Sequence, residues 1–221
     1  MMLPSFVNLP IGADFDDIPP EMRKLIFEFL GSPKTIEYNS QDRNEITVKL
    51  TDDDKGHVFS AILKADFTGE YSLDNSSKEN QKNVDEGAAT LTFKILESTQ
   101  AGERLGSMQK FVKKTEDMLF LKRYGNGEWV LKIDLHSQES RNKASDLISQ
   151  TFPEIYSLLF DKLLQLHEDR IRNEKKYDWC ANDTLCKQNE KILENLKSLN
   201  ESVTVKKELI LNKQSVSTKK T

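Results

Sequence analysis

One apolar run constrains the fold of this chain more than any other feature. Between Phe152 and Leu166, hydrophobic residues recur at steps of three and four, which is the spacing of one helical stripe or of a coiled-coil seam. The members of this stripe are Phe152, Ile155, Leu159, Leu163 and Leu166. So apolar a stripe must be covered, either by the rest of the chain or by a second copy of it.

The helix that carries the stripe is predicted to run from Ala144 to about Asp178, with Pro153 bending its first turns. Asn182 either interrupts this helix or caps a new one. A second apolar set then follows in a register that differs by one residue, which implies a stutter, a break or a fold-back. Its members are Leu185, Ile192, Leu196 and Leu199. We therefore predict a helical stalk over residues 139–205, a coiled coil whose two apolar sets form a dimer or partner interface.

The residues before the stalk predict a sheet. Apolar and polar residues alternate with a period of two in several short segments, which is typical of half-buried strands. The predicted strands are Thr35–Asn39, Glu45–Leu50, Val58–Phe67, Thr90–Leu96, Met118–Tyr124 and Glu128–Leu135. The second and third should form an antiparallel hairpin, as should the last two, which are joined by the tight connection Gly125-Asn126-Gly127. The predicted fold class is α+β, with an antiparallel β-rich head over residues 1–138, short packing helices and a long C-terminal helix or coiled-coil stalk.

Two short helices are expected to pack on the head, over Pro20–Leu30 and Glu103–Thr115. The first resembles the opening of an F-box in Ile18-Pro19-Pro20-Glu21, but an F-box continues as helices and a strand is predicted here. The second carries Lys110, Lys113 and Lys114, which indicate a solvated face, with a phosphate-binding patch as the alternative. A polar surface loop is expected over Ser72–Gly87.

Composition limits the classes of function. The net charge of −4 does not indicate nucleic-acid binding, and 31% charged residues favour an elongated chain with much solvated helix. No signal peptide is expected, because Met1 to Ile11 lack a basic region and a long apolar core. No membrane span is expected, because no run approaches about 20 apolar residues. Residues 206–221 are predicted to be a disordered basic tail that serves as a docking or import tag, with Lys206, Lys207, Lys219 and Lys220. We expect a nuclear protein, with the cytoplasm as the alternative.

No residue pattern predicts catalysis. The chain has three histidines, His57, His136 and His167, and none lies near a nucleophile motif. Asp52-Asp53-Asp54 is typical of a solvated turn, and the further oxygen ligands of a cation site are missing. Cys180 and Cys186 lack the other ligands that zinc needs and are expected to be reduced. We therefore expect neither an enzyme nor a bound cofactor or metal.

Two stretches resemble a known superfamily. Ile46 to Asp54 followed by Val58–Phe67 is similar to the hairpin with a Leu-Thr-Asp connection in the heads of the ligase IV-associated end-joining scaffold, XLF, PAXX and the centriolar cartwheel protein. The passage from Phe120–His136 into the helix from Ala144 resembles the last head strands of this superfamily entering their dimerising stalk. The helix Pro20–Leu30 and the strand Thr90–Leu96 depart from that pattern.

The resemblance implies a non-enzymatic homodimeric scaffold. Such a scaffold bridges DNA ends in non-homologous end joining by holding a ligase or an end-binding protein, and contact with DNA is expected to be indirect. The expected partners are a second copy through the stalk helix and another protein on the stalk or tail. The alternative function is a structural subunit of a kinetochore or centriole type of complex, whose helix pairs with a different protein. For the dimer, Leu159→Asp with Leu163→Asp is expected to give a folded monomeric head.

Overall fold

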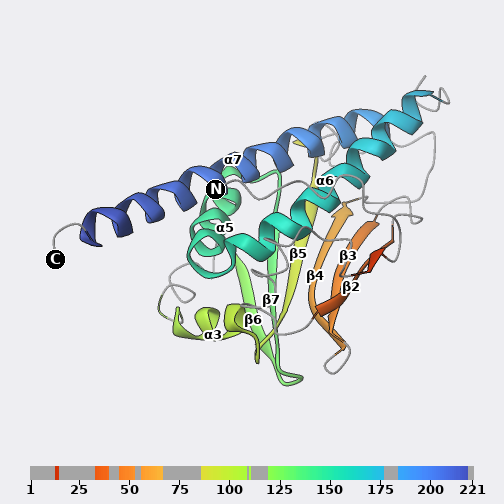
Figure 1. Ribbon diagram of the computed structural model, residues 1–221. Helices are drawn as coiled ribbons and strands as arrows, with labels where there is room; N and C mark the ends of the chain where they lie inside the picture. The colour runs from red at the N-terminus through yellow and green to blue at the C-terminus, as the bar shows by residue number, and fades with distance from the viewer. Residues whose placement is uncertain are drawn as a thin grey trace.

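The computed structural model describes residues 13–14, 33–39, 45–52, 56–66, 86–108, 110, 119–176 and 184–218. Several predicted features lie outside these ranges, namely the helix Pro20–Leu30, Asp53, Asp54, most of the loop Ser72–Gly87, Lys113, Lys114 and Asn182. The described part of the chain has an α+β fold, in which an antiparallel sheet is followed by a long C-terminal helix, as the sequence predicts (Figure 1).

Seven strands form one antiparallel sheet in the order β1-β2-β3-β4-β5-β7-β6. Their bounds are β1 Ala13–Asp14, β2 Pro33–Asn39, β3 Glu45–Asp52, β4 Gly56–Ala65, β5 Ala89–Leu96, β6 Phe120–Tyr124 and β7 Glu128–Asp134. Both predicted hairpins are confirmed, as β3 with β4 and β6 with β7. Because β7 pairs with β5, the last hairpin extends the sheet and leaves β6 at its edge. Gly127 supplies the positive φ of 78° that its turn requires.

The period-two alternation of the strands gives the sheet one buried face. A single row across four strands illustrates it: Val48 pairs with Ala61, Ala61 with Phe93, and Phe93 with Leu131. All four side chains are fully buried. The residues between them along each strand point to the other face and are mostly polar. The helices therefore have one apolar surface to cover.

The described helices are α3 Gln100–Ser107, α5 Gln138–Thr151, α6 Pro153–Lys176 and α7 Thr184–Thr218. Helix α3 begins three residues before the predicted start because the hydroxyl of Thr99 accepts a hydrogen bond from the Gly102 amide, at 3.1 Å, and caps it. Ser137 caps α5 in the same way, accepting from the Ser140 amide at 3.2 Å.

The single helix predicted from Ala144 to about Asp178 is wrong, because the structure has two helices there. Helix α5 ends at Thr151, and Phe152 has a non-helical φ of −147° and ψ of 48°. Pro153 is the first residue of α6. Proline suits a first helical position because its missing N–H is not needed there, but its ring prevents an existing helix from continuing through it. The chain therefore turns at this point and does not merely bend.

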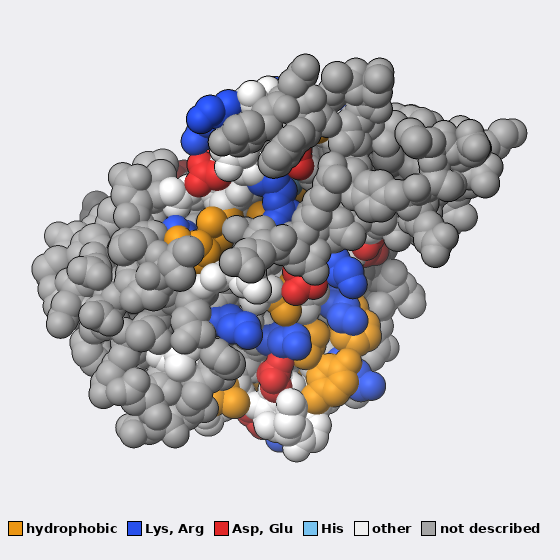
Figure 2. Space-filling view, turned by 90° about the vertical axis from the view of Figure 1, so that its right-hand side faces the viewer, with side chains coloured by type: hydrophobic (Ala, Val, Ile, Leu, Met, Phe, Trp, Pro, Cys, Tyr) orange, Lys and Arg blue, Asp and Glu red, His pale blue; other side chains and the backbone are white. Residues whose placement is uncertain are grey.

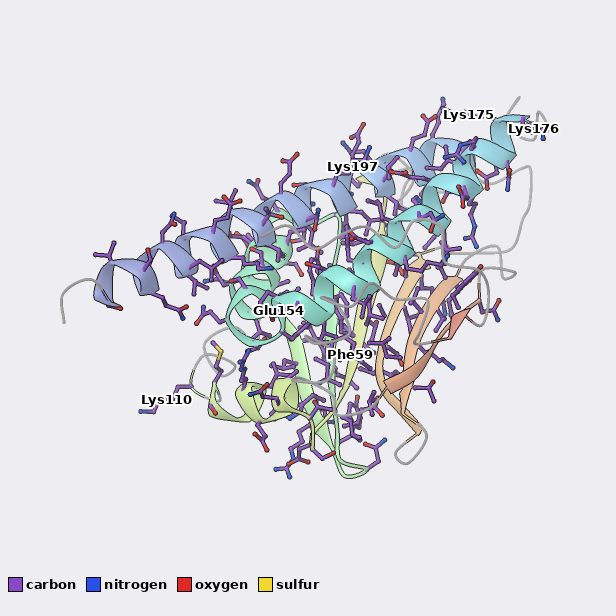
Figure 3. All side chains as sticks on the ribbon, viewed as in Figure 1. Phe59, Lys110, Glu154, Lys175, Lys176 and Lys197 are labelled. Carbon is purple, nitrogen blue, oxygen red and sulfur yellow. The ribbon has the colours of Figure 1, made fainter. Side chains whose placement is uncertain are left out.

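Helices α6 and α7 form an antiparallel hairpin, so the change of register reflects a fold-back. Figure 1 shows α6 crossing the sheet over β4 and β3, and α7 returning along α6 and then α5. Two ion pairs follow the antiparallel register, Lys175 with Glu190 at 2.7 Å and Lys197 with Glu168 at 4.0 Å. Figure 3 shows Lys175 and Lys176 at the far end of α6, where α7 begins.

The predicted division into a head of residues 1–138 and a stalk of residues 139–205 does not match the core. One hydrophobic cluster contains residues of β3, β4, β5 and β7 together with residues of α5, α6 and α7. Helices on the far side of the proposed boundary supply the cover that the sheet needs, so the two parts share one core and are not independent units.

Gly87 allows α7 to approach the start of β5 closely. It has a positive φ of 64°, and a Cβ added to it would lie 2.8 Å from the backbone of Lys191 and Ile192. Backbone atoms cannot yield as a flexible side chain would. A residue without a side chain is therefore required where α7 crosses.

Candidate functional site

The predicted dimer stripe on α6 lies inside the protein. Phe152, Ile155, Leu159 and Leu163 are fully buried, and Leu166 is 9% exposed. All five belong to the cluster that includes the buried face of the sheet. The prediction that a second chain covers this stripe is therefore wrong for these side chains, and the alternative that the chain covers it with its own sheet is correct.

Aromatic rings make the contact between α6 and the sheet. The ring centroid of Phe152 lies 5.4 Å from that of Phe59 on β4 and 5.6 Å from that of Phe93 on β5, both in edge-to-face geometry. Tyr156 lies 5.8 Å from Phe93 and stacks on Phe160 at 5.0 Å. Figure 3 shows Phe59 between the sheet and α6. The turn at Pro153 lets Phe152 enter this cluster.

The second predicted set is also internal. Ile192, Leu196 and Leu199 are buried in the same cluster, and Val203 continues it one turn further. Leu185 lies in α7, but its side chain is outside the described residues. The described members of both predicted interface sets therefore stabilise one chain and are not free to bind another.

A buried polar network holds α6 and α7 in register. The Asn189 amide donates to both carboxylate oxygens of Glu174 at 3.2 Å, and the Nε2 atom of His167 donates to the Asn189 carbonyl at 2.9 Å. The Cys186 sulfur lies 3.6 Å from Glu174 Oε2, and Cys186 is disulfide-bonded, contrary to the expectation of reduced cysteines. Cys180 lies outside the described residues. Asn189 thus sets the register of the helical hairpin within one chain.

The electrostatics of α6 follow from its burial. Burial lowers the pKa of His167 to about 4, so this side chain is neutral at pH 7. Burial also raises the pKa of Asp161 to about 6 and lowers the pKa of Lys162. The Lys162 ammonium lies 4.1 Å from the centroid of the Tyr38 ring and so ties α6 to β2. His167 and Lys162 therefore join α6 to α7 and to β2.

The predicted disordered tail begins too early. Residues 206–218 continue α7, and Lys206 is tightly held. Its ammonium makes a 2.7 Å ion pair with Asp146 and donates to the Ser145 hydroxyl and to two oxygens of Asn142 at 2.7–2.9 Å. Lys207 is half-buried beside it, and Lys219 and Lys220 lie outside the described residues. Lys206 is therefore a clamp between α7 and α5.

At the Lys206 clamp, α7 leaves the body and projects from it (Figure 1). This segment, residues 205–217, is called the projecting end. It exposes four large hydrophobic side chains, Val205 by 55%, Leu209 by 54%, Leu211 by 47% and Val216 by 59%. Val205, Leu209 and Val216 share one stripe with Asn212, at steps of four, three and four. The sequence contains this pattern, but the lysines around it led to the prediction of a tail.

A groove lies between the projecting end and the body. Its volume is about 710 Å³, and the α5–α6 junction forms its other wall. The residues that line it include Arg104, Asp146 and Glu154 from the body, and Lys207, Leu209, Ile210, Leu211 and Lys213 from the projecting end. Charges of both signs face this groove. The groove separates the projecting end from the α5–α6 junction, and its mixed charges do not select a charged ligand.

A smaller pocket of about 540 Å³ lies between α3 and the β6–β7 hairpin. Trp129 lines it, and its buried indole N–H has no hydrogen-bond acceptor among the described residues. The Arg123 and Glu97 side chains that line the pocket form an ion pair at 2.5 Å. Each charge neutralises the other, so neither marks the pocket as a site for a charged ligand.

Neither metal binding nor membrane insertion is indicated in the described ranges. No group of three or more His, Cys, Asp and Glu side chains there could hold a metal ion. None of the helices described combines the length and the apolar character of a membrane span. The candidate functional site is therefore the projecting end of α7. Comparison of the chain with protein-family models, curated proteins and solved structures finds no match.

Proposed function

We propose that this protein is a non-enzymatic scaffold that self-associates through the projecting end of α7. The observation that carries the proposal is the exposed stripe of Val205, Leu209 and Val216 on a helix that has left its own core. Helices that expose an apolar stripe at three- and four-residue spacing pair with a second helix to cover it. A second copy would bring the same stripe.

The charges beside the stripe favour a parallel pair of identical helices. With Val205 and Asn212 at d positions and Leu209 and Val216 at a positions, Glu208 falls at g and Lys213 at the following e. In a parallel coiled coil these positions face each other across the interface. Two Glu208–Lys213 pairs of opposite charge would therefore form by symmetry. Asn212, at a d position, would meet its own copy in the seam.

The projecting end is already helical before it binds a second helix. Isolated short helices are marginal in water because the first turn is costly to form. Here the turns before Val205 are packed in the core and Lys206 is clamped to α5, so the projecting end extends a helix that already exists. Binding therefore does not have to include the cost of nucleating a helix.

The size of the stripe predicts a weak dimer. Three side chains from each copy are already half-covered, so each gains about 1 kcal/mol when it is fully buried. A total of about 6 kcal/mol falls near the lower end of the roughly 4–15 kcal/mol that association costs. The two Glu208–Lys213 pairs contribute little in addition because they are exposed. We therefore expect an association that depends on protein concentration.

The resemblance to end-joining scaffolds leads us to propose a biological role. Two bodies held side by side by their C-terminal helices are the arrangement that this superfamily uses, and on that basis the dimer would hold a ligase or an end-binding protein in non-homologous end joining. The second candidate is a subunit whose projecting end pairs with an acidic helix of another protein. Apart from the clamped Lys206, Lys207 and Lys213 still outnumber Glu208 on this segment, which favours such a partner.

Sedimentation equilibrium over a wide range of protein concentration tests self-association. Leu209→Asp with Val216→Asp should leave a monomer at all concentrations, because it places charges in the seam. Leu211→Asp is the matched control, since Leu211 is similarly exposed but lies about 200° around the helix from Leu209. Equal masses for the wild type and the double variant at every concentration would contradict the self-dimer and leave the partner helix as the proposal.

A charge exchange tests the parallel register. Glu208→Lys should weaken the dimer, because it places lysine opposite Lys213, and adding Lys213→Glu should restore it. Failure of the second substitution to restore association would exclude the parallel arrangement even if a dimer forms.

A further inference from the structure

We propose that the face of the sheet turned away from the helices binds single-stranded nucleic acid across β5, β7 and β6. This inference does not depend on self-association through α7. The binding surface, called the open patch, consists of the lysines Lys94, Lys122 and Lys132 and the aromatic residues Phe120 and Tyr124, with Lys49 at its margin. Figure 2 shows Lys and Arg side chains beside exposed hydrophobic ones on one face of the molecule.

Strand register brings these residues together. On β6, the alternation places Phe120, Lys122 and Tyr124 on the same side of the sheet. Lys122 pairs with Val130 on β7, and Val130 pairs with Lys94 on β5. The same row continues through Ser60 on β4 to Lys49 on β3. Phe120 pairs directly with Lys132.

Two aromatic rings are exposed on this face of the sheet, where polar residues would be the usual choice at a surface in contact with water. Phe120 is 42% exposed and Tyr124 is 38% exposed, and they stand about 13 Å apart along β6, with Lys122 between them. Exposed rings on a sheet provide faces on which unpaired bases stack. Duplex bases are already stacked on one another, so the patch suits a single strand.

Among the described residues, the lysines of the open patch have no acidic partner. Lys49, Lys94, Lys122 and Lys132 form no ion pair within that part of the chain, whereas several lysines on α6 and α7 do. Lys132 rests 5.0 Å from the centroid of Phe120, and Lys122 rests 5.2 Å from that of Tyr124. An exposed cation–π contact is weaker than base stacking, so these ammonium groups can leave the rings for phosphates when a strand binds.

The acidic residues of β7 lie at its two ends. Glu128 is near the turn, where its carboxylate accepts from the Asn126 amide at 3.4 Å, and Asp134 is the last residue of the strand. In the middle of the patch, Val130 lies between Lys122 and Lys94 and is only 8% exposed. The lysines of the open patch can neutralise the phosphates of a single strand, and the two exposed rings can stack on its bases. This local positive charge is present although the net charge of the chain is −4.

Fluorescence anisotropy with labelled oligothymidylate and oligouridylate of equal length tests this proposal on the full chain. Binding should be strongest at low salt, because lysines contact phosphates. The DNA and RNA oligonucleotides should bind alike, because neither stacking nor phosphate contact requires the 2′-hydroxyl. Phe120→Ala with Tyr124→Ala should weaken binding on the order of fivefold or more for each ring. Both rings are exposed, so circular dichroism should show an unchanged fold.

Salt dependence separates the patch from general charge effects. The triple variant with Gln at Lys94, Lys122 and Lys132 should reduce the slope of log affinity against log salt by about 2, because each phosphate that a lysine neutralises on a single strand contributes roughly 0.7 to that slope. The matched control replaces Lys143, Lys187 and Lys197 by Gln and removes the same charge elsewhere. Three results would each overturn the proposal. They are an equal reduction of the salt slope in both triple variants, an unchanged affinity when both rings are replaced by alanine, and a duplex bound as tightly as the single strands.

Discussion

The two halves of helix α7 have similar apolar spacing and opposite environments. From Ile192 to Val203 the apolar residues are buried against α5, α6 and the sheet. From Val205 to Val216, four of them are about half exposed, namely Val205, Leu209, Leu211 and Val216. Once the body ends, the stripe of the first half has no core left to pack against. In the second half, Val205, Leu209 and Val216 lie on a different side of the helix. Periodicity therefore identifies an apolar face, whereas the end of the body decides whether that face is core or interface.

Equivalent truncations in the two halves should therefore have unequal effects on the free energy of unfolding. Leu196→Ala should lower the free energy of unfolding by about 2–5 kcal/mol, because it leaves a cavity in the shared core. Leu209→Ala should change it by less than about 0.5 kcal/mol in the monomer. Urea denaturation at low protein concentration measures both. Similar decreases in the two variants would show that the projecting end packs on the body.

Burial in the shared core also changes the expected effect of Leu159→Asp with Leu163→Asp. Both side chains are fully buried there. Two carboxylates without partners in a core cost far more than a protein of this size can tolerate. These substitutions should unfold the protein and cannot give a folded monomeric head.

The sheet could be predicted because the period-two alternation is a local property. Leu91, Phe93 and Ile95 had to share a face whatever covered them, and the tight connection at Gly125-Asn126-Gly127 fixed the last hairpin. The cover of the α6 stripe could not be predicted in this way. The spacing from Phe152 to Leu166 is the same whether a sheet or a second helix lies against it, and only the turn at Pro153 directs it to the sheet.

The candidate sites were predicted less well for a different reason. The lysines from Lys206 onward suggested a solvated tail, although Lys206 is clamped by Asp146 from a helix 60 residues earlier in the sequence. A partner so distant in sequence leaves no local pattern. The open patch was hidden in the same way, because Lys94, Lys122 and Lys132 become neighbours only through the pairing of β5, β7 and β6.

The next largest effect concerns the packing of α7 on α6, where His167 of α6, which bonds to the Asn189 carbonyl of α7, should make the stability of the protein depend on pH. Its pKa is about 4 in the folded chain and 6.5 when unfolded, so the unfolded state binds the proton more tightly. Stability should therefore fall as the pH decreases from 6.5 to about 4, by on the order of 3 kcal/mol relative to His167→Gln. Urea unfolding at a series of pH values gives this difference, and parallel curves for the two proteins would contradict it.

Asp161 should act in the opposite direction over much of the same range. Burial raises its pKa from 3.8 to about 6, so its contribution to stability is full at low pH and is lost as the pH rises through 6. The two groups partly cancel in the wild type. Asp161→Asn should therefore make the decrease in stability on acidification steeper, and it serves as the control for His167→Gln.

The smallest effect is expected at the boundary between the two halves. Lys206→Met keeps the aliphatic stem but removes the ammonium that bonds to Asn142, Ser145 and Asp146, and should cost about 1 kcal/mol because the clamp is partly exposed. Amide exchange should become faster after residue 206 and stay unchanged before Val203, since only the projecting end depends on this anchor. Lys207→Met, which removes a neighbouring charge outside the clamp, should alter neither. If exchange instead quickened along all of α7, the helix would be one cooperative unit and its two halves would differ in exposure but not in local stability.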